Sequence, residues 1–174
     1  GEDGFELFFP AKQAVKVWEA ILKEGKAESV LPIGLAARDI LRFEACMPLY
    51  GHEISDSITP LEAGLGFALS LDKEFIGRDA LLKQKLEGPK RLLVGFEMVE
   101  RGVAREHYPV MVEGKEVGHV TRGMFSPTTN RYLGMALMPA ELSAIGTDID
   151  IVIRNKPTKA RIVKRPFYIP AYRR

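Results

Sequence analysis

GLAARDILRFEACMPLYG, at residues 34–51, is the stretch around which the rest of the chain is organised. Its first half predicts a helix with one apolar side, formed by Leu35, Ile40, Leu41 and Phe43. Arg38 and Arg42 share a face of this helix, where two cations repel each other unless an anion lies between them. Pro48 and Gly51 then stop the helix and begin a loop. The stretch is a candidate site, but an arginine pair alone is a weak signal.

Upstream of this stretch, the pattern predicts a strand and a helix. Residues 5–9, FELFF, are rich in aromatic side chains and are bounded by glycine and proline, which is typical of a short strand. Glu6 would share its strand face with Phe8, so its carboxylate needs a partner if it is buried. Over residues 11–24 apolar side chains recur at helical spacing, and Gly25 is placed to end that helix.

Downstream, the sequence alternates between loop, strand and helix signals. Residues 47–60 are polar and predict a loop, and LGFALSL at residues 65–71 predicts a second strand. A third helix is expected over residues 79–85, ended by the Gly-Pro pair at residues 88–89. The first half of the chain is therefore expected to form a layer of helices and strands, and the fold class is α+β.

After Pro89 the pattern changes to short alternating runs separated by turn residues. Six strands are expected over residues 91–97, 110–113, 115–121, 133–137, 148–154 and 159–164. Glu113-Gly114-Lys115 has the composition of a tight hairpin turn. Regularly spaced short strands indicate a small antiparallel barrel or sandwich, of which we expect the barrel. The sequence thus predicts two domains, residues 1–88 and residues 89–174.

Composition describes a soluble globular chain. Hydrophobic residues make up 46% and charged residues 28% of 174 positions, and every apolar run is too short to span a membrane. Cys46 is the only cysteine, which excludes a disulfide framework and fits a reducing compartment. We expect a cytoplasmic protein, or one of the mitochondrial matrix if the source is eukaryotic.

The net charge of +2 hides an asymmetry along the chain. Residues 151–174 contain eight basic and no acidic residues, which leaves 17 basic against 23 acidic residues, a balance of −6, in the rest. A basic tail on an acidic body suggests an anionic ligand or partner at that end. The alternative is a solvated strand rich in lysine and arginine. Aromatic residues within the tail would also suit single-stranded nucleic acid, which we regard as a minor alternative.

Seven segments follow, in order, the pattern of one known family. They are GEDGFE at 1–6, GLAARDILRFEA at 34–45, LYGHEI at 49–54, TPLEAGLGF at 59–67, FIGRDALL at 75–82, GHVTRGMFSPT at 118–128 and RPFYIPAY at 165–172. With these segments the chain resembles the glycine cleavage system T-protein, the tetrahydrofolate-dependent aminomethyltransferase. It departs from many relatives at Arg122, where they have serine, so the usual contacts of that loop are not assumed.

The resemblance covers the C-terminal half of that family. It implies that residues 1–88 are part of the folate-binding domain and that the N-terminal half of the same protein is a partner. The family's catalytic aspartate lies in that N-terminal half, so we expect no catalytic residue in this chain and no activity from it alone. Tetrahydrofolate is the implied substrate and the lipoylated H-protein the implied carrier, with no membrane partner and no metal.

The resemblance also assigns folate contacts to Glu6 and Arg38. A carboxylate accepts two adjacent donors of a pterin edge side by side, and a guanidinium suits the carboxylates or carbonyls of folate. The alternatives are a salt bridge between Glu6 and Arg38, a solvated Glu6, or pairing of Arg38 with Glu44. Asp39 and Arg42, three residues apart, are instead expected to form a local ion pair.

A third folate contact is implied at the C-terminus. The family brings its tail back to the folate pocket, and Tyr172, Arg173 and Arg174 are the candidates, with Arg173 and Tyr172 preferred. The alternative is a frayed terminus.

Other motifs carry weaker signals. His52, His107 and His119 lack metal-ligand spacing, so no metal site is predicted. Ser126-Pro127 has no accompanying base, and the glycines at 64 and 66 lack the context of a dinucleotide fingerprint. Two other functions stay open: the folate domain of a flavin-dependent sarcosine or dimethylglycine oxidase or dehydrogenase, and a non-enzymatic, RNA-associated module.

Overall fold

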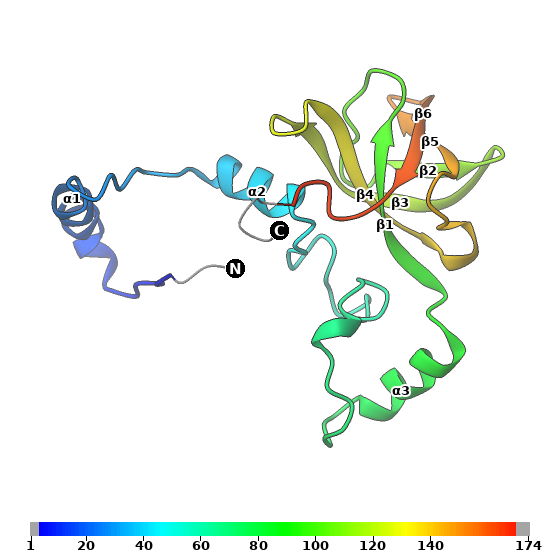
Figure 1. The fold of residues 1–174 in the computed structure, drawn as a ribbon, viewed down its shortest axis with the longest axis horizontal. Coiled ribbons are helices and arrows are strands. Elements are labelled where there is room, and N and C mark those ends of the chain that lie inside the picture. Colours follow the sequence, from blue (N-terminus) through cyan, green and yellow to red (C-terminus); the bar gives the residue numbers. More distant parts are fainter. Residues whose placement is uncertain (1–3, 170–174) are drawn as a thin grey trace. The chain divides into compact units, whose positions relative to one another are not determined.

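The computed structural model describes residues 4–169 of the chain. It divides into two compact units, residues 1–38 and residues 39–174 (Figure 1). The boundary falls inside the helix α2, Leu35–Glu44. The division into domains at residues 88 and 89 stays a prediction.

The first unit contains a short 3-10 turn and one complete helix. Residues 4–10 have no regular structure, and η1 (Ala11–Gln13) leads into α1 (Ala14–Glu24). The amide of Gly25 donates to the carbonyl of Ile21 at 2.9 Å, which confirms the predicted end of this helix. The predicted strand at residues 5–9 is wrong. A strand needs a neighbour for its backbone hydrogen bonds, and the part of the chain described here pairs none with this segment.

Two further helices follow, separated by turns. α2 confirms the predicted helix, and α3 (Arg78–Glu87) confirms the one expected before Gly88. The predicted strand at residues 65–71 is wrong, because the segment forms a 3-10 turn, η2 (Gly66–Ala68). Short apolar runs do not distinguish strand from turn by periodicity, and the side chain of Phe67 is 88% exposed.

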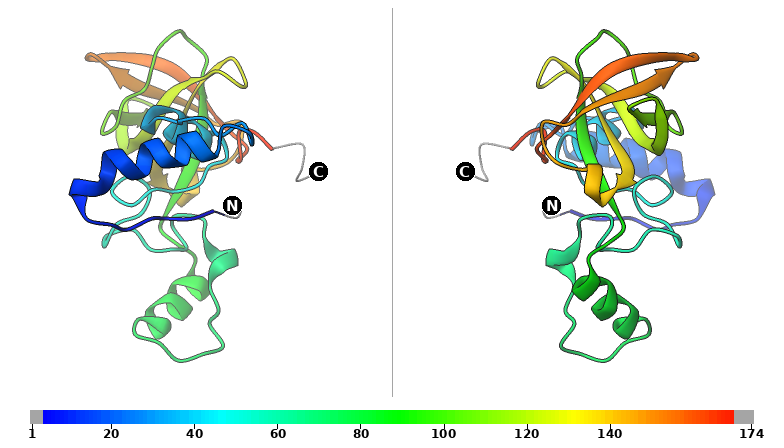
Figure 2. Two further views of the ribbon diagram at one scale, coloured as in Figure 1. Left: turned by 90° about the vertical axis from the view of Figure 1, so that its left-hand side faces the viewer. Right: turned by 90° about the vertical axis from the view of Figure 1, so that its right-hand side faces the viewer.

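The last part of the chain is a closed antiparallel barrel of six strands (Figures 1 and 2). The strands are β1 (Arg91–Met98), β2 (Pro109–Val112), β3 (Lys115–Ser126), β4 (Arg131–Pro139), β5 (Asp148–Ile153) and β6 (Lys156–Val163). Their order around the barrel is β1-β4-β3-β2-β5-β6, and β6 pairs with β1 to close it. All six predicted strands are present, and both the α+β class and the barrel are confirmed.

Two tight turns set the register of neighbouring strands. Glu113 and Gly114 both have positive φ, 50° and 76°, as the predicted turn between β2 and β3 requires. Arg154 and Asn155, with φ of 50° and 62°, make a similar turn between β5 and β6. That second turn lacks glycine, so composition alone did not indicate it.

The strands β1 and β4 are buried on both faces. Inside the barrel lie Val94, Phe96, Met98, Ala104, Val110, Val120, Ala136, Met138, Ile149, Ile151, Ala160 and Ile162. A second cluster of Leu93, Leu133 and Met135 packs with Phe43 from the end of α2 and with Phe167. This second cluster attaches the last turn of α2 and the segment after β6 to the barrel.

A close approach between neighbouring strands marks the centre of the barrel. Phe96 on β1 and Gly134 on β4 are register partners. A Cβ at position 134 would lie 2.1 Å from Cζ of Phe96, so the fully buried ring occupies the space that the glycine leaves. Among residues 4–169, no helix is both long enough and apolar enough to cross a membrane.

Candidate functional site

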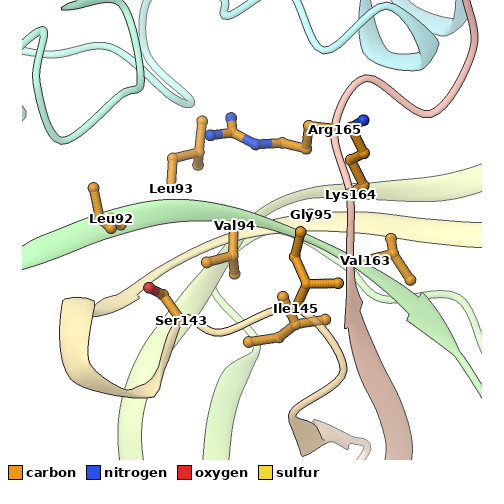
Figure 3. A pocket seen from close by; sticks show the side chains of 10 residues that line it. Leu92, Leu93, Val94, Gly95, Ser143, Ile145, Val163, Lys164 and Arg165 are labelled. Carbon is orange, nitrogen blue, oxygen red and sulfur yellow. The ribbon is translucent and has the colours of Figure 1, made fainter.

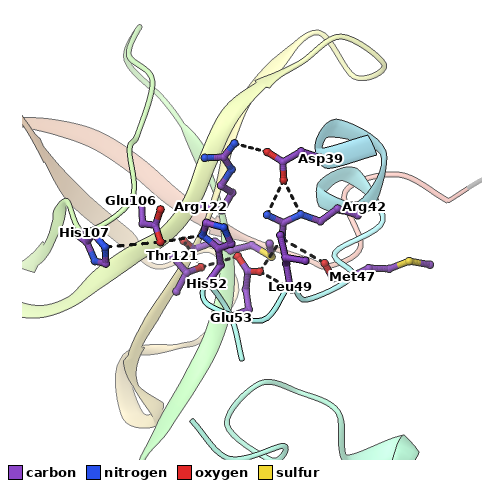
Figure 4. A network of polar contacts seen from close by, with 11 residues as sticks. Asp39, Arg42, Met47, Leu49, His52, Glu53, Glu106, His107, Thr121 and Arg122 are labelled. Carbon is purple, nitrogen blue, oxygen red and sulfur yellow. Dashed lines mark hydrogen bonds and ion pairs between the residues drawn. The ribbon is translucent and has the colours of Figure 1, made fainter. Parts of the chain in front are cut away.

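The end of α2 meets the loop after it through a buried ion pair (Figure 4). Arg42 donates from Nη1 to Oε2 of Glu53 at 2.7 Å, and the side chain of Glu53 has no exposed surface. The same carboxylate accepts the backbone amide of Leu49 at 3.1 Å and, on Oε1, the hydroxyl of Thr121 at 3.1 Å. Glu53 thus joins helix, loop and strand β3 through three donors.

Asp39 extends this network toward β3. Arg42 donates from Nε to Oδ1 of Asp39 at 2.8 Å, which confirms the predicted local pair. On the other side Arg122 pairs with Oδ2 of Asp39 (Figure 4). Burial raises the pKa of the Asp39 carboxyl, but the hydrogen bonds and charges of Arg122 and Arg42 outweigh burial and lower that pKa below its ordinary value.

The sequence anticipated only part of this network. The repulsion between Arg38 and Arg42 indicated that an anion was needed, and Arg42 obtains two, Asp39 and Glu53. Nothing in the spacing identified Glu53 or Arg122 as partners, because both contacts join segments that are distant along the chain. Chemically the network is a positioning device that holds the second half of α2 against the barrel.

The lowered pKa of Asp39 implies that the stability of the fold depends on pH. Since the folded state holds this proton less tightly than the unfolded state, the stabilisation is complete above the ordinary pKa of 3.8 and is lost as pH falls through the folded-state value. We expect Asp39→Asn to be less stable than the parent at neutral pH and to lose less further stability on acidification below about pH 4. Urea unfolding at pH 7, 4 and 3 measures this.

The matched control is Asp56→Asn, at an exposed carboxylate for which the described residues supply no ion pair. It should follow the parent at every pH. Equal acid sensitivity of Asp39→Asn and the parent would contradict the prediction.

A second buried carboxylate lies at the last residue of α2. Glu44 accepts the hydroxyl of Ser126 at 2.6 Å and the amide of Thr128 at 3.3 Å. The hydroxyl of Thr129 also bonds to that of Ser126, at 2.7 Å. Ser126 is the last residue of β3, and its hydroxyl ties the end of this strand to α2. Glu44 therefore does not pair with Arg38.

All three histidines of the chain line one small cavity of about 160 Å³. Nδ1 of His52 lies 2.9 Å from Oε1 of Glu106, and His107 lies on the other side of that carboxylate (Figure 4). Burial, together with the charges of His107 and Arg91, lowers the pKa of His119. Across residues 4–169, no three histidine, cysteine or acidic side chains are arranged to hold a metal ion.

The residues predicted to contact folate lie in different parts of the chain. Glu6 lies in the irregular segment before η1 and Arg38 lies on α2, and both side chains are exposed. Neither forms an ion pair or a side-chain hydrogen bond with any residue from 4 to 169, so the salt bridge between them is not formed. Tyr172, Arg173 and Arg174 lie outside the described residues.

The basic tail is partly neutralised within the β5–β6 hairpin. Lys159 pairs with Asp150 at 2.8 Å, and Arg161 pairs with Asp148 at 2.7 Å. A positively charged hollow of about 610 Å³ lies beside the β5–β6 turn, and it is lined by Arg101, Gly102, Val103, Arg105, Tyr108, Tyr132, Ile153 and Arg154. Its three arginines form no ion pair within residues 4–169, and the sequence analysis did not find this hollow.

Two family models match the chain one after the other. The GCVT N-terminal domain matches residues 1–73, and the glycine cleavage T-protein C-terminal barrel domain matches residues 91–168. The chain belongs to the glycine cleavage T-protein family. The T-protein barrel model covers β1 to β6, which agrees with the closed barrel of the structure.

Relatives within the T-protein family are similar over the whole chain. An aminomethyltransferase of Symbiobacterium thermophilum is 54% identical over 176 residues, which cover 100% of this chain and 47% of that protein. An aminomethyltransferase of Geobacillus kaustophilus is 56% identical and covers 97% of this chain and 47% of that protein. The chain therefore spans about half the length of these relatives and corresponds to their C-terminal half.

A solved relative supports the fold. The crystal structure of glycine cleavage system aminomethyltransferase T from Bartonella henselae superposes with a TM-score of 0.81 at 30% identity. The match covers 92% of this chain and 45% of that one.

Proposed function

We propose that this chain is the C-terminal half of a tetrahydrofolate-dependent aminomethyltransferase of glycine cleavage. The observation that carries the proposal is the ordered match of both T-protein family models, with aminomethyltransferases at 54% and 56% identity over nearly all of the chain. The complete protein would take the aminomethyl group from the lipoyl arm of the H-protein. Its methylene carbon would pass to tetrahydrofolate, with release of ammonia and of the dihydrolipoyl arm.

Glu6 and Arg38 are proposed to bind the folate. Both side chains are exposed and have no partner within the described residues, so their charges are available to a ligand. The Glu6 carboxylate would accept the ring N–H and the exocyclic amine of the pterin, and the Arg38 guanidinium would face carbonyl or carboxylate oxygens. Tyr172 and Arg173 stay candidates for a contact from the tail.

Two surfaces suit the proposed protein partners. An apolar hollow of about 440 Å³ is lined by Phe9, Ala14, Val15, Val17, Trp18, Glu19 and Ile21, and Trp18 is 52% exposed. An apolar surface of this kind fits the N-terminal half of the protein, which would bury it. The hollow with Arg101, Arg105 and Arg154 would suit an acidic face of the H-protein.

A chimera tests the proposal, with the N-terminal half of the Geobacillus kaustophilus relative joined to this chain. We expect tetrahydrofolate-dependent release of ammonia from aminomethyl-loaded H-protein by the chimera and none by the 174-residue chain alone. Glu6→Gln in the chimera should raise the KM for tetrahydrofolate by about tenfold or more, because one charged hydrogen bond contributes about 1.5–3 kcal/mol.

The matched control is Glu28→Gln, which removes the same charge from another exposed position in the same unit. It should leave the KM unchanged. A folded chimera without activity would refute the proposed reaction, and ammonia release by the isolated chain would refute its inactivity. An unchanged KM in Glu6→Gln would refute the role of Glu6 alone.

A further inference from the structure

Arg165 is a partly buried cation for which the fold makes room. It follows β6, and its side chain lies over strand β1 beside Leu93 (Figure 3). A Cβ at Gly64 would lie 3.0 Å from Nη2 of Arg165, and a Cβ at Gly95 would lie 2.7 Å from its Cγ. Two glycines, one in the turn before η2 and one in β1, therefore leave the space that the arginine fills.

Among residues 4–169, the guanidinium of Arg165 binds no protein anion. The other partly buried arginines of this unit each bond to a carboxylate; they are Arg42, Arg78, Arg91, Arg122 and Arg131. For Arg165 no hydrogen bond or ion pair is present with any residue from 4 to 169. The partly buried guanidinium is therefore unpaired within the described residues, and an anionic ligand would supply the charge-assisted hydrogen bonds that the other arginines make to carboxylates.

The nearest acidic groups do not neutralise it. Glu53 is already engaged by Arg42 at 2.7 Å. Burial raises the pKa of the Cys46 thiol to about 11, so the thiol is uncharged at neutral pH. Burial also lowers the pKa of the Arg165 guanidinium below its ordinary value.

Arg165 borders a cavity that is suited to an amphipathic anion. The cavity has a volume of about 430 Å³ and is lined by Ala45, Cys46, Met47, Pro48, Ala63, Gly64, Leu65, Phe67, Arg165 and Pro166. Among the described residues that line it, Arg165 is the only charged one, and the others are apolar or weakly polar. The volume lies within the range of about 300–1,000 Å³ that is typical of small-molecule sites.

We propose that Arg165 and this cavity bind an organic carboxylate, with the carboxylate on the guanidinium and an aromatic or apolar body against Phe67 and Leu65. A planar guanidinium binds a carboxylate through two parallel hydrogen bonds, and the apolar wall favours a body that leaves water. The site is distinct from Glu6 and Arg38, and only its folate alternative rests on the proposed function. Its ligand is either a free aromatic acid or the benzoylglutamate end of a folate.

Calorimetric titration of the 174-residue chain tests this with three probes: 4-aminobenzoate, 4-aminobenzoylglutamate and the uncharged 4-aminobenzamide. We expect saturable binding of at least one acid and at least tenfold weaker binding of the amide. Arg165→Gln should weaken acid binding at least tenfold, and Arg165→Lys should weaken it less. The matched control, Lys164→Gln, removes the neighbouring exposed cation and should change acid affinity less than twofold.

The relative affinity for the two acids identifies whether the natural ligand is a folate or a free aromatic acid. Binding of 4-aminobenzoylglutamate at least tenfold tighter than 4-aminobenzoate points to a folate, and equal binding points to a free aromatic acid. No saturable binding of either acid, equal binding of the amide, or equal losses in Lys164→Gln and Arg165→Gln would overturn the proposal. Thermal unfolding of each variant verifies that it is folded. If Arg165→Gln does not fold, the comparison of Arg165→Lys with the parent chain tests the proposal.

Discussion

Replacing Glu53 with alanine is expected to lower the free energy of unfolding by about 3–5 kcal/mol, because removal of one partner leaves the other buried and unpaired. Glu53 is fully buried and accepts from Arg42, Thr121 and the amide of Leu49. Loss of its carboxylate leaves Arg42, whose side chain is 10% exposed, with Asp39 as its one remaining carboxylate among the described residues. Urea unfolding at neutral pH measures the loss.

A double variant separates the ion pair from general damage to packing. Arg42→Met/Glu53→Ala should be more stable than the sum of the two single losses predicts, because the second change removes the cation that the first leaves unpaired. The surface pair of Asp148 and Arg161 is the control, since both side chains are more than half exposed. Asp148→Ala should cost far less than Glu53→Ala, because an exposed ion pair is screened by water. A similarly small loss in Glu53→Ala would show that the buried pair does not stabilise the fold.

The second large effect is expected at the contact between Gly134 and Phe96. Gly134→Ala adds a methyl group where the ring of Phe96 already lies, with Cζ 2.1 Å from the new Cβ. The ring is fully buried among the residues inside the barrel and has no free space to move into. We expect a loss of about 2–3 kcal/mol in the free energy of unfolding, the range found for overpacked cores.

A second variant distinguishes the steric clash with Phe96 from the loss of backbone freedom that any glycine-to-alanine change brings. Phe96→Leu shortens the side chain, so Gly134→Ala should cost much less in that background than in the parent. Gly34→Ala serves as the control, because a Cβ at position 34 would meet nothing within 4 Å. It should change stability by less than about 0.5 kcal/mol. Equal costs of Gly134→Ala in both backgrounds would contradict the explanation.

The sequence predicted the elements that are determined by local pattern. Alternation and turn residues located all six barrel strands, and helical spacing located α1, α2 and α3. The two strand predictions that are wrong, at residues 5–9 and 65–71, are short apolar runs. Whether such a run becomes a strand depends on a neighbouring strand, which the run itself does not encode.

The candidate site was predictable to a smaller extent, for the same reason. The pair of Asp39 and Arg42 lies within one helix turn and could be inferred from spacing. The contacts of Glu53 with Thr121 and of Arg122 with Asp39 join positions 68 and 83 residues apart, so only the folded chain reveals them. The same holds for Arg165, whose role is visible only once Gly64 and Gly95 are seen against it.

Closure of the barrel has a consequence for how this half of the protein behaves in solution. Each of the six strands has a hydrogen-bonded neighbour on both sides, since β6 returns to β1. An open sheet would present a row of free amide and carbonyl groups, which is a template for strands of other molecules. The ring of strands offers no such template, so its attachment to further polypeptide depends on side-chain surfaces and leaves the β-structure unchanged.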